Sequence, residues 1–248
     1  MTLAIVKKSH HMVTAQFSIT AREQDILTLI FKELKRSADS VKYGKDLELK
    51  TEFQFTTKDL IDYFGIGRDT AYELMATLAK GMVGKQAIVK QIALKNVPQK
   101  VKVLTLCSYG EYDSGQLTLR IDKATAHYML DYSKGFAEID FKLSLSLSGA
   151  HEKRLLDLIS RFKYDQYTCS LGEFYALLGT NPKHYSSFTV FRRTVLDRPL
   201  KRLIKKSSGT WVATDEKGLG YTLSKTGRSY TNTSRLTLTM KFVNFLKP

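Results

Sequence analysis

The sequence has 248 residues, which is enough for one large domain or for two domains of ordinary size. Hydrophobic residues make up 43% and charged residues 25%, a balance that excludes a disordered chain. Lysine and arginine total 39 against 24 for aspartate and glutamate, so the formal net charge is +15. Such an excess destabilises a compact chain but attracts polyanions, of which nucleic acid is the commonest. A generally basic surface without a dedicated partner is the alternative.

Cysteine usage and hydropathy exclude other classes. Cys107 and Cys169 are too few for a disulfide framework or a zinc site. The longest apolar stretches fall far short of the ~20 residues that cross a bilayer. The first segment, MTLAIVKKSHHM, has its apolar run before its lysines, unlike a secretory signal. We therefore expect a cytoplasmic protein with no membrane association.

The first half of the chain predicts helices followed by hairpin strands. Residues 20–36 place Ile26, Leu27, Ile30, Phe31 and Leu34 on one helical stripe. A short strand at 52–55 leads into a helix whose start, Thr56 followed by Asp59, has the spacing of a capping box. That helix stops at Gly65, and another follows at 68–81 with Ala71, Leu74, Met75 and Leu78 inward. Alternating segments at 86–95, 101–107 and 116–121 predict β-hairpin strands.

The second half repeats this order. We predict a helix at 150–163, a strand at 167–169, a capping pair Ser170–Glu173 and a second helix ending near Gly179. A long helix at about 187–206 and strands near 210–214, 219–224 and 234–243 follow. The segments DLIDYFGI (59–66) and EFYALLGT (173–180) align without a gap at an offset of 114 residues. The chain therefore contains a structural repeat.

Helix, strand, helix, tight glycine-containing turn, helix and hairpin is the order of a winged helix. We predict an α+β fold of two tandem winged-helix domains, 1–132 and 133–248. The last helix of each helix-turn-helix can lie in a major groove, while the wing touches the flanking backbone. Winged helices also serve as protein-interaction modules, which is the alternative reading of this fold.

Positive charge is concentrated in the second copy. Residues 183–206 hold eight basic residues and one acid, Asp197, whereas the charges of the corresponding first-copy helix cancel. We expect the second domain to read most of the sequence, because the arginine fork can bond O6 and N7 of guanine and hydroxyls can reach phosphates or bases. The candidate DNA contacts are Lys183, Ser186, Ser187, Thr189, Arg192, Arg193, Arg198, Lys201, Lys225 and Arg228, with Arg68, Thr70 and Tyr72 from the first copy.

The expected recognition helix changes phase midway. Phe188, Phe191 and Val195 form one apolar stripe, whereas Leu196, Leu200 and Leu203 continue it rotated by about a quarter turn or more. Pro199 lies at this change and removes a helical hydrogen bond. We therefore expect the helix either to kink there or to end and restart.

Enzyme chemistry finds no support in the motifs. His10 and His11 are adjacent, whereas two ligands on a strand that share one metal need alternate positions. The segment 81–86 lacks the glycine spacing and the Ser/Thr of a phosphate-binding loop. We expect no catalytic site, no cofactor and no metal.

The order of elements, and above all FTVFRRTVLDRPLKRLIKK followed by a Trp-containing strand and hairpin, resembles the iteron-binding initiator (Rep) family of theta-replicating plasmids. Phe191-Arg192-Arg193 matches the start of that family's second recognition helix, and HEKRLLDLISRFKYD, with Arg154-Leu155, matches its entry segment. Pro199 departs from the family's uninterrupted helix.

This resemblance implies a protein that binds double-stranded DNA at short direct repeats of an origin as a monomer and helps to open an adjacent AT-rich tract. It also implies recruitment of the host initiator ATPase and the replicative helicase. Dimers in equilibrium with monomers, joined through the first winged helix, would repress the protein's own gene. A winged-helix transcriptional regulator and a nicking replication enzyme are the alternatives.

Overall fold

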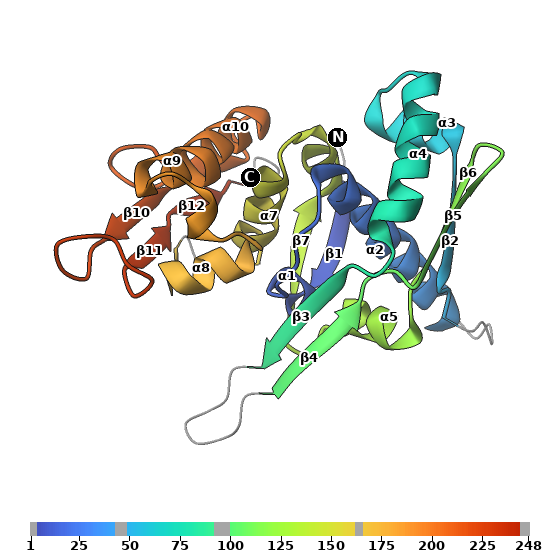
Figure 1. Cartoon of the computed structure of the whole chain (residues 1–248), viewed down its shortest axis with the longest axis horizontal. Helices are drawn as coiled ribbons and strands as arrows, with labels where there is room; N and C mark the ends of the chain where they lie inside the picture. Colours follow the sequence, from blue (N-terminus) through green and yellow to red (C-terminus); the bar gives the residue numbers. More distant parts are fainter. Residues whose placement is uncertain (1–3, 43–48, 92–99, 162–165, 244–248) are drawn as a thin grey trace. The chain divides into compact units, whose positions relative to one another are not determined.

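A computed structural model describes residues 4–42, 49–91, 100–161 and 166–243, and the chain divides into two compact units (Figure 1). The N-terminal unit is Ile5–Phe136, and the C-terminal unit is Ala137–Pro248, to which the first residues also belong. The division falls inside strand β7 (Phe136–Asp140), a few residues after the domain boundary expected from the sequence, residue 132. Part of the expected strand 86–95 and part of the expected helix 150–163 lie outside the described residues.

The N-terminal unit is built around the long helix α2. Its Ile26, Ile30 and Phe31 side chains are buried, as the apolar stripe predicts. Strands β2, β6 and β5 form an antiparallel sheet in that order, and Phe53 of β2 faces inward opposite Leu119 of β6. In chain order the elements are β1 (Ile5–Ser9), α1 (His10–Val13), α2 (Ala21–Lys42), β2 (Glu52–Thr56), α3 (Thr57–Phe64), α4 (Arg68–Met82), β3 (Gln86–Gln91), β4 (Lys100–Thr105), β5 (Tyr109–Asp113), β6 (Gln116–Arg120) and α5 (Lys123–Leu130).

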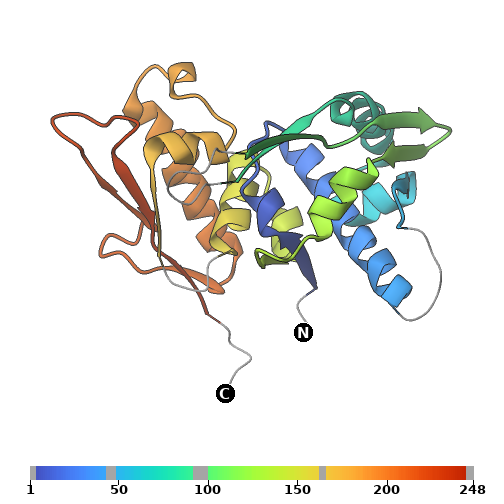
Figure 2. The same cartoon turned by 90° about the horizontal axis from the view of Figure 1, so that it is seen from below.

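The C-terminal unit repeats this sheet with strands β8, β11 and β10 in the same relative order. Figure 2 shows its helices α7, in yellow, and α10, in orange, side by side. In chain order the elements are β7 (Phe136–Asp140), α6 (Phe141–Ser146), α7 (Ala150–Ile159), β8 (Tyr167–Ser170), α8 (Leu171–Leu177), the 3-10 turn η1 (Pro182–His184), α9 (Phe188–Arg192), the π-helical turn η2 (Arg193–Asp197), α10 (Arg198–Lys206), β9 (Trp211–Ala213), β10 (Tyr221–Ser224), β11 (Arg235–Leu238) and β12 (Met240–Phe242).

The same kind of junction between a strand and a helix occurs in each unit. The last residue of β2, Thr56, caps α3 by accepting from the Asp59 amide at 3.2 Å, and the Asp59 carboxylate accepts from the Thr56 amide at 2.7 Å. Ser170 and Glu173 make the same two bonds at 3.2 and 2.8 Å. The helices α3 and α8 then reach Gly65 and Gly179, whose φ angles of 60° and 62° favour glycine. Both predicted capping boxes are confirmed, and the fold is α+β with two tandem winged helices.

The wing of the N-terminal unit differs from the expected one. It is the hairpin β5–β6, turned by Ser114 and Gly115 with φ of 47° and 82°, and β3 pairs separately with β4. Sequence reasoning missed β5, because its residues YGEYD have no apolar alternation. Of the residues of α4 predicted to lie inward, Ala71, Met75 and Leu78 are buried, whereas Leu74 is only half-buried. The elements β1, α1, α5, β7 and α6 were not anticipated.

The recognition helix neither ends nor restarts at Pro199. Arg192, Arg193, Asp197 and Arg198 all have right-handed helical angles, so α9, η2 and α10 form one continuous path. The Arg198 amide donates to the Arg193 carbonyl five residues earlier, which defines the wider π turn. A π turn holds one residue more than an α-helical turn, so it rotates the position of the apolar stripe that follows it. The change of phase in the sequence is thereby compensated. Leu196, Leu200 and Leu203 are therefore buried together with Phe191 and Val195.

Replacing Ser170 with alanine removes the cap of α8. We expect the free energy of unfolding of the C-terminal unit to fall by about 1 kcal/mol, because a helix amide loses its partner. Urea denaturation followed by the fluorescence of the single, buried tryptophan, Trp211, measures this loss. Ser170→Thr keeps the hydroxyl and serves as the control. Equal losses in the two variants would show that the cap does not stabilise the helix.

Candidate nucleic-acid interface

The start of the recognition helix presents small polar side chains to solvent. Ser186 and Thr189 are exposed, as is Lys183 in η1. Ser187 is the N-cap of α9, and its hydroxyl accepts from the Val190 amide at 3.2 Å. The Ser187 hydroxyl therefore has a structural use that competes with the predicted contact to DNA.

The two arginines at the centre of the helix differ in their surroundings. Arg193 is exposed and has no acidic partner within the described residues. Arg192 is 45% exposed, but its Nε lies 3.5 Å from Oδ2 of Asp197. The sequence makes both arginines candidate DNA contacts but does not predict this ion pair, because on an ordinary α-helix Asp197 would not lie beside Arg192. The structure therefore singles out Arg193 as the freer of the two.

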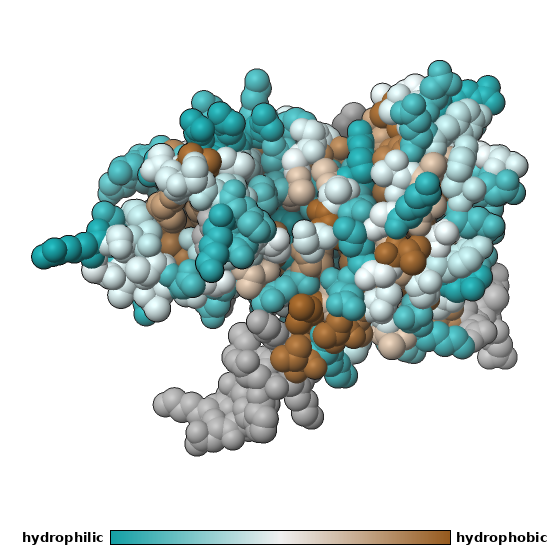
Figure 3. All heavy atoms as spheres, in the orientation of Figure 1, coloured by the Kyte–Doolittle hydropathy of each residue, from teal (hydrophilic) through white to brown (hydrophobic). Residues whose placement is uncertain are grey.

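The basic side chains of α10 fall into two groups. Arg198, Lys201 and Lys205 are exposed. By contrast, Arg202 Nη1 donates to Glu152 Oε1 of α7 at 3.0 Å, and Lys206 Nζ donates to the Ser146 carbonyl. These two residues fasten α10 within the unit, so part of the positive charge is structural. In the space-filling view, hydrophilic side chains gather over α10 (Figure 3).

Aromatic packing holds the helix from behind. Phe191 is buried, with the rings of Tyr175 and Tyr185 edge-on to it at 4.8 and 5.3 Å between centroids. The buried Arg154 of α7 donates to the Leu177 carbonyl at 2.8 Å and so satisfies the end of α8. Burial lowers the pKa of Arg154. In the Arg154-Leu155 pair, which carries part of the family resemblance, the arginine therefore has a structural role.

The wing of the C-terminal unit is basic and is fixed to the recognition helix. Lys225 and Arg228 are exposed on the loop between β10 and β11, where Gly227 has a φ of 103°. Tyr230 of this loop stacks on Phe188, with ring centroids 4.2 Å apart and planes 20° apart. Lys225 Nζ lies 5.2 Å from the Tyr230 ring centroid. The wing and the start of α9 therefore form one surface.

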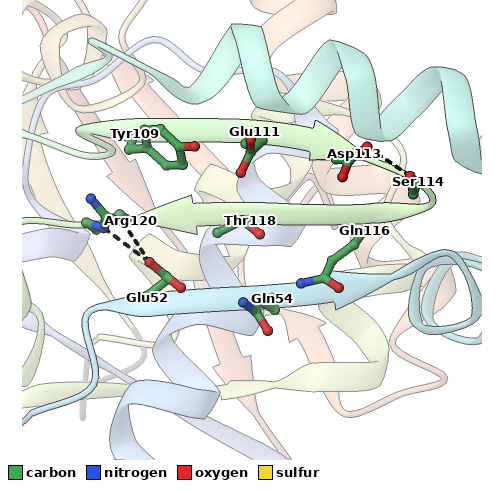
Figure 4. Close-up of a pocket in the computed structure, with 9 residues that line it drawn as sticks. All are labelled: Glu52, Gln54, Tyr109, Glu111, Asp113, Ser114, Gln116, Thr118 and Arg120. Carbon is green, nitrogen blue, oxygen red and sulfur yellow. Dashed lines mark hydrogen bonds and ion pairs between the residues drawn. The ribbon is translucent and has the colours of Figure 1, made fainter.

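The N-terminal unit presents a different surface at the equivalent place. Thr70 is exposed and Tyr72 is half-buried, while Arg68 Nε donates to the Tyr72 hydroxyl at 2.8 Å. The outer face of the sheet forms a polar pocket (Figure 4) that carries three carboxylates, from Glu52, Glu111 and Asp113. Its one cationic lining residue, Arg120, is bonded to Glu52 at 2.8 Å. Carboxylates repel phosphate, so this wing sheet is a poor surface for DNA.

Within the ranges that the structure describes, no three His, Cys, Asp or Glu side chains converge as they would to hold a metal ion. His10 Nδ1 lies 2.7 Å from the Lys134 carbonyl oxygen, and His11 Nε2 lies 3.2 Å from Asp131 Oδ2, so the adjacent histidines have separate partners. Among the described helices, none has the length and the apolar content that a membrane crossing requires.

A family model and one solved structure agree with this architecture. The model of a family described as "Initiator Replication protein, WH1" matches residues 5–160. The crystal structure of the Pi initiator protein in complex with iteron DNA is similar to the chain, with a TM-score of 0.62 and 18% identity over 99% of both chains. The WH1 domain of MSBI1.176, a replication protein isolated from a multiple sclerosis patient, has a TM-score of 0.32 and 12% identity, covering 51% of this chain and 85% of that domain. No curated protein matches by sequence.

Variants of two neighbouring residues of α10 distinguish a charge that stabilises the fold from one that is only exposed to solvent. Arg202→Ala leaves the buried carboxylate of Glu152 without its guanidinium, so we expect the free energy of unfolding to fall by about 1–2 kcal/mol. Lys201→Ala removes an exposed charge and should change it by less than about 0.5 kcal/mol. Urea denaturation followed by Trp211 fluorescence compares the two variants. A loss in Lys201→Ala as large as in Arg202→Ala would contradict this division.

Proposed function

Because the chain belongs to the family of initiator replication proteins, we propose that it is a plasmid replication initiator that binds double-stranded DNA at origin repeats. One observation carries this proposal. The C-terminal unit presents an exposed recognition helix and a basic wing on one continuous surface, joined by the Phe188–Tyr230 stack. The Pi initiator, whose fold matches the chain over nearly its whole length, was crystallised with iteron DNA, which supports repeated sites as the target.

We assign different tasks to the two domains. The C-terminal domain (133–248) reads sequence through Thr189, Arg193 and their neighbours on the helix, while Lys201, Lys225 and Arg228 contact phosphates. The N-terminal domain (1–132) contacts the DNA backbone through α4 and forms the homodimer that is in equilibrium with the monomer. Val101 and Val103 of β4, which are 53% and 55% exposed, support a protein contact on this domain. The hairpin β3–β4 bears the brown patch in Figure 3.

The later steps follow from the family resemblance. Binding of several copies to the repeats would promote opening of the origin, and the protein would then recruit the host initiator ATPase and the replicative helicase in the cytoplasm. The dimer would repress the protein's own gene. Each step requires binding and no bond-breaking chemistry by the chain itself.

A footprint on the DNA that flanks the protein's own gene tests this function. We expect protection of several direct repeats spaced by about two helical turns, because copies bound to one face of the duplex recur at that interval. Protection of a single inverted repeat would instead favour a transcriptional regulator. The same supercoiled DNA incubated with the protein and Mg²⁺ or Mn²⁺ should stay unnicked. Nicking would contradict the proposal in favour of a replication nuclease.

Arg193 and Lys201 should affect binding differently. Arg193→Ala should cost about 1–3 kcal/mol on the footprinted repeat and much less on random DNA, because an exposed arginine at this position can bond a base edge. Lys201→Ala should weaken both equally and lower the slope of log K against log salt by about 1, because one phosphate contact is lost. Fluorescence anisotropy on labelled duplexes at several salt concentrations measures both. Equal losses on both DNAs for Arg193→Ala would assign that side chain to the phosphate backbone.

A further inference from the structure

Three side chains of the C-terminal unit form a chain of contacts from the wing sheet to the recognition helix. The Tyr221 hydroxyl on β10 donates to Asp197 Oδ1, and Asp197 Oδ2 lies 3.5 Å from Arg192 Nε. Tyr221 is buried, whereas Arg192 is 45% exposed, so the chain runs from the core to the surface. Burial, together with the hydrogen bond to Asp197, raises the pKa of the Tyr221 hydroxyl, which therefore remains a proton donor.

The π turn makes this arrangement possible. Residues five apart on an α-helix project about 140° from each other, so Asp197 would point away from Arg192. In η2 the helix widens to bonds between residues five apart, and the two side chains come together. Pro199 has no amide hydrogen, so it cannot make the α-helical bond to the Val195 carbonyl. The narrower α-helical pattern therefore lacks one of its bonds at this position. Pro199, which departs from the family pattern, thus lies beside the turn that brings Arg192 and Asp197 into contact.

The pairing engages one edge of the guanidinium and leaves the other available. Arginine has five N–H donors, and Asp197 faces the one on Nε. Within the described chain, Nη1 and Nη2 have no hydrogen-bond acceptor. These two nitrogens can reach O6 and N7 of a guanine together, provided that the plane of the guanidinium is held.

We propose that Asp197, held by Tyr221, is a positioning residue that orients Arg192 for bidentate recognition of a guanine in the major groove. The proposal rests on the proposed function, since it requires that this helix reads DNA. A partly exposed ion pair contributes little to stability, so the pair is a weak stabilising device. Its effect is instead to restrict the rotamers of a long side chain, which lowers the entropy lost when the base is bound. A carboxylate near phosphates also penalises binding that does not include the guanine contact.

Base-by-base substitution of the footprinted repeat tests this role. Binding of the full-length wild type to duplexes with each base pair changed in turn gives its base preferences, and Arg192→Ala identifies the position that Arg192 reads. Asp197→Asn keeps the size of the side chain and removes its charge. We expect preference for guanine at that one position to fall about 3–10-fold, a coupling typical of contacting residues. Tyr221→Phe, which removes one oxygen, should cause a smaller fall at the same position.

The remaining variants separate the possible outcomes. Arg192→Ala/Asp197→Asn should show no further loss at that position beyond Arg192→Ala, because the effect passes through Arg192. Lys201→Ala should weaken all duplexes equally, and Trp211 fluorescence should report unchanged unfolding midpoints for Asp197→Asn. If Asp197→Asn tightened binding to every duplex equally, Asp197 would act by charge alone and the inference would fail while the proposed function stood. If the wild type showed no base preference, the proposed function would fail and this inference with it.

Discussion

The junction at which a strand becomes a helix determines how each half of this chain is built. One residue, Thr56 or Ser170, is both the last residue of its strand and the cap of the next helix. Because no linking residue separates the strand from the helix, the direction of the strand sets the direction of α3 or α8. Gly65 and Gly179 then turn the chain toward the next helix. The position of the recognition helix in each unit therefore depends on bonds that span three residues.

The two halves share this framework but differ in electrostatics. In the N-terminal unit the wing sheet carries the carboxylates of Glu52, Glu111 and Asp113, and Arg68 is bonded to Tyr72. In the C-terminal unit the wing carries Lys225 and Arg228. The two wings therefore share a backbone arrangement but present opposite charges to a phosphate. The net charge of +15 alone does not reveal this difference.

Features that depend on neighbouring residues could be predicted, and features that depend on distant ones could not. The capping boxes and the stripe of α2 involve residues within a few positions of one another, so their spacing was informative. Strand β5 is a strand because β6 pairs with it, and its own sequence has no period. The bond between Arg202 and Glu152 joins residues 50 positions apart. Counting basic residues therefore overstated the free charge of α10.

The π turn shows why the pairing of Arg192 with Asp197 could not be predicted from the sequence. A projection at 100° per residue places Arg192 near the boundary of the apolar face and gives Asp197 no relation to it. The observed turn follows a different period, and it forms at the point where Pro199 removes one helical donor. A break in the regular helix thus changes which side chains meet, although Arg192, Arg193, Asp197 and Arg198 all keep right-handed helical angles. In this chain the apolar phase shift, Pro199 and the pairing of Asp197 with Arg192 all meet at one π turn, so none of the three can be interpreted without the others.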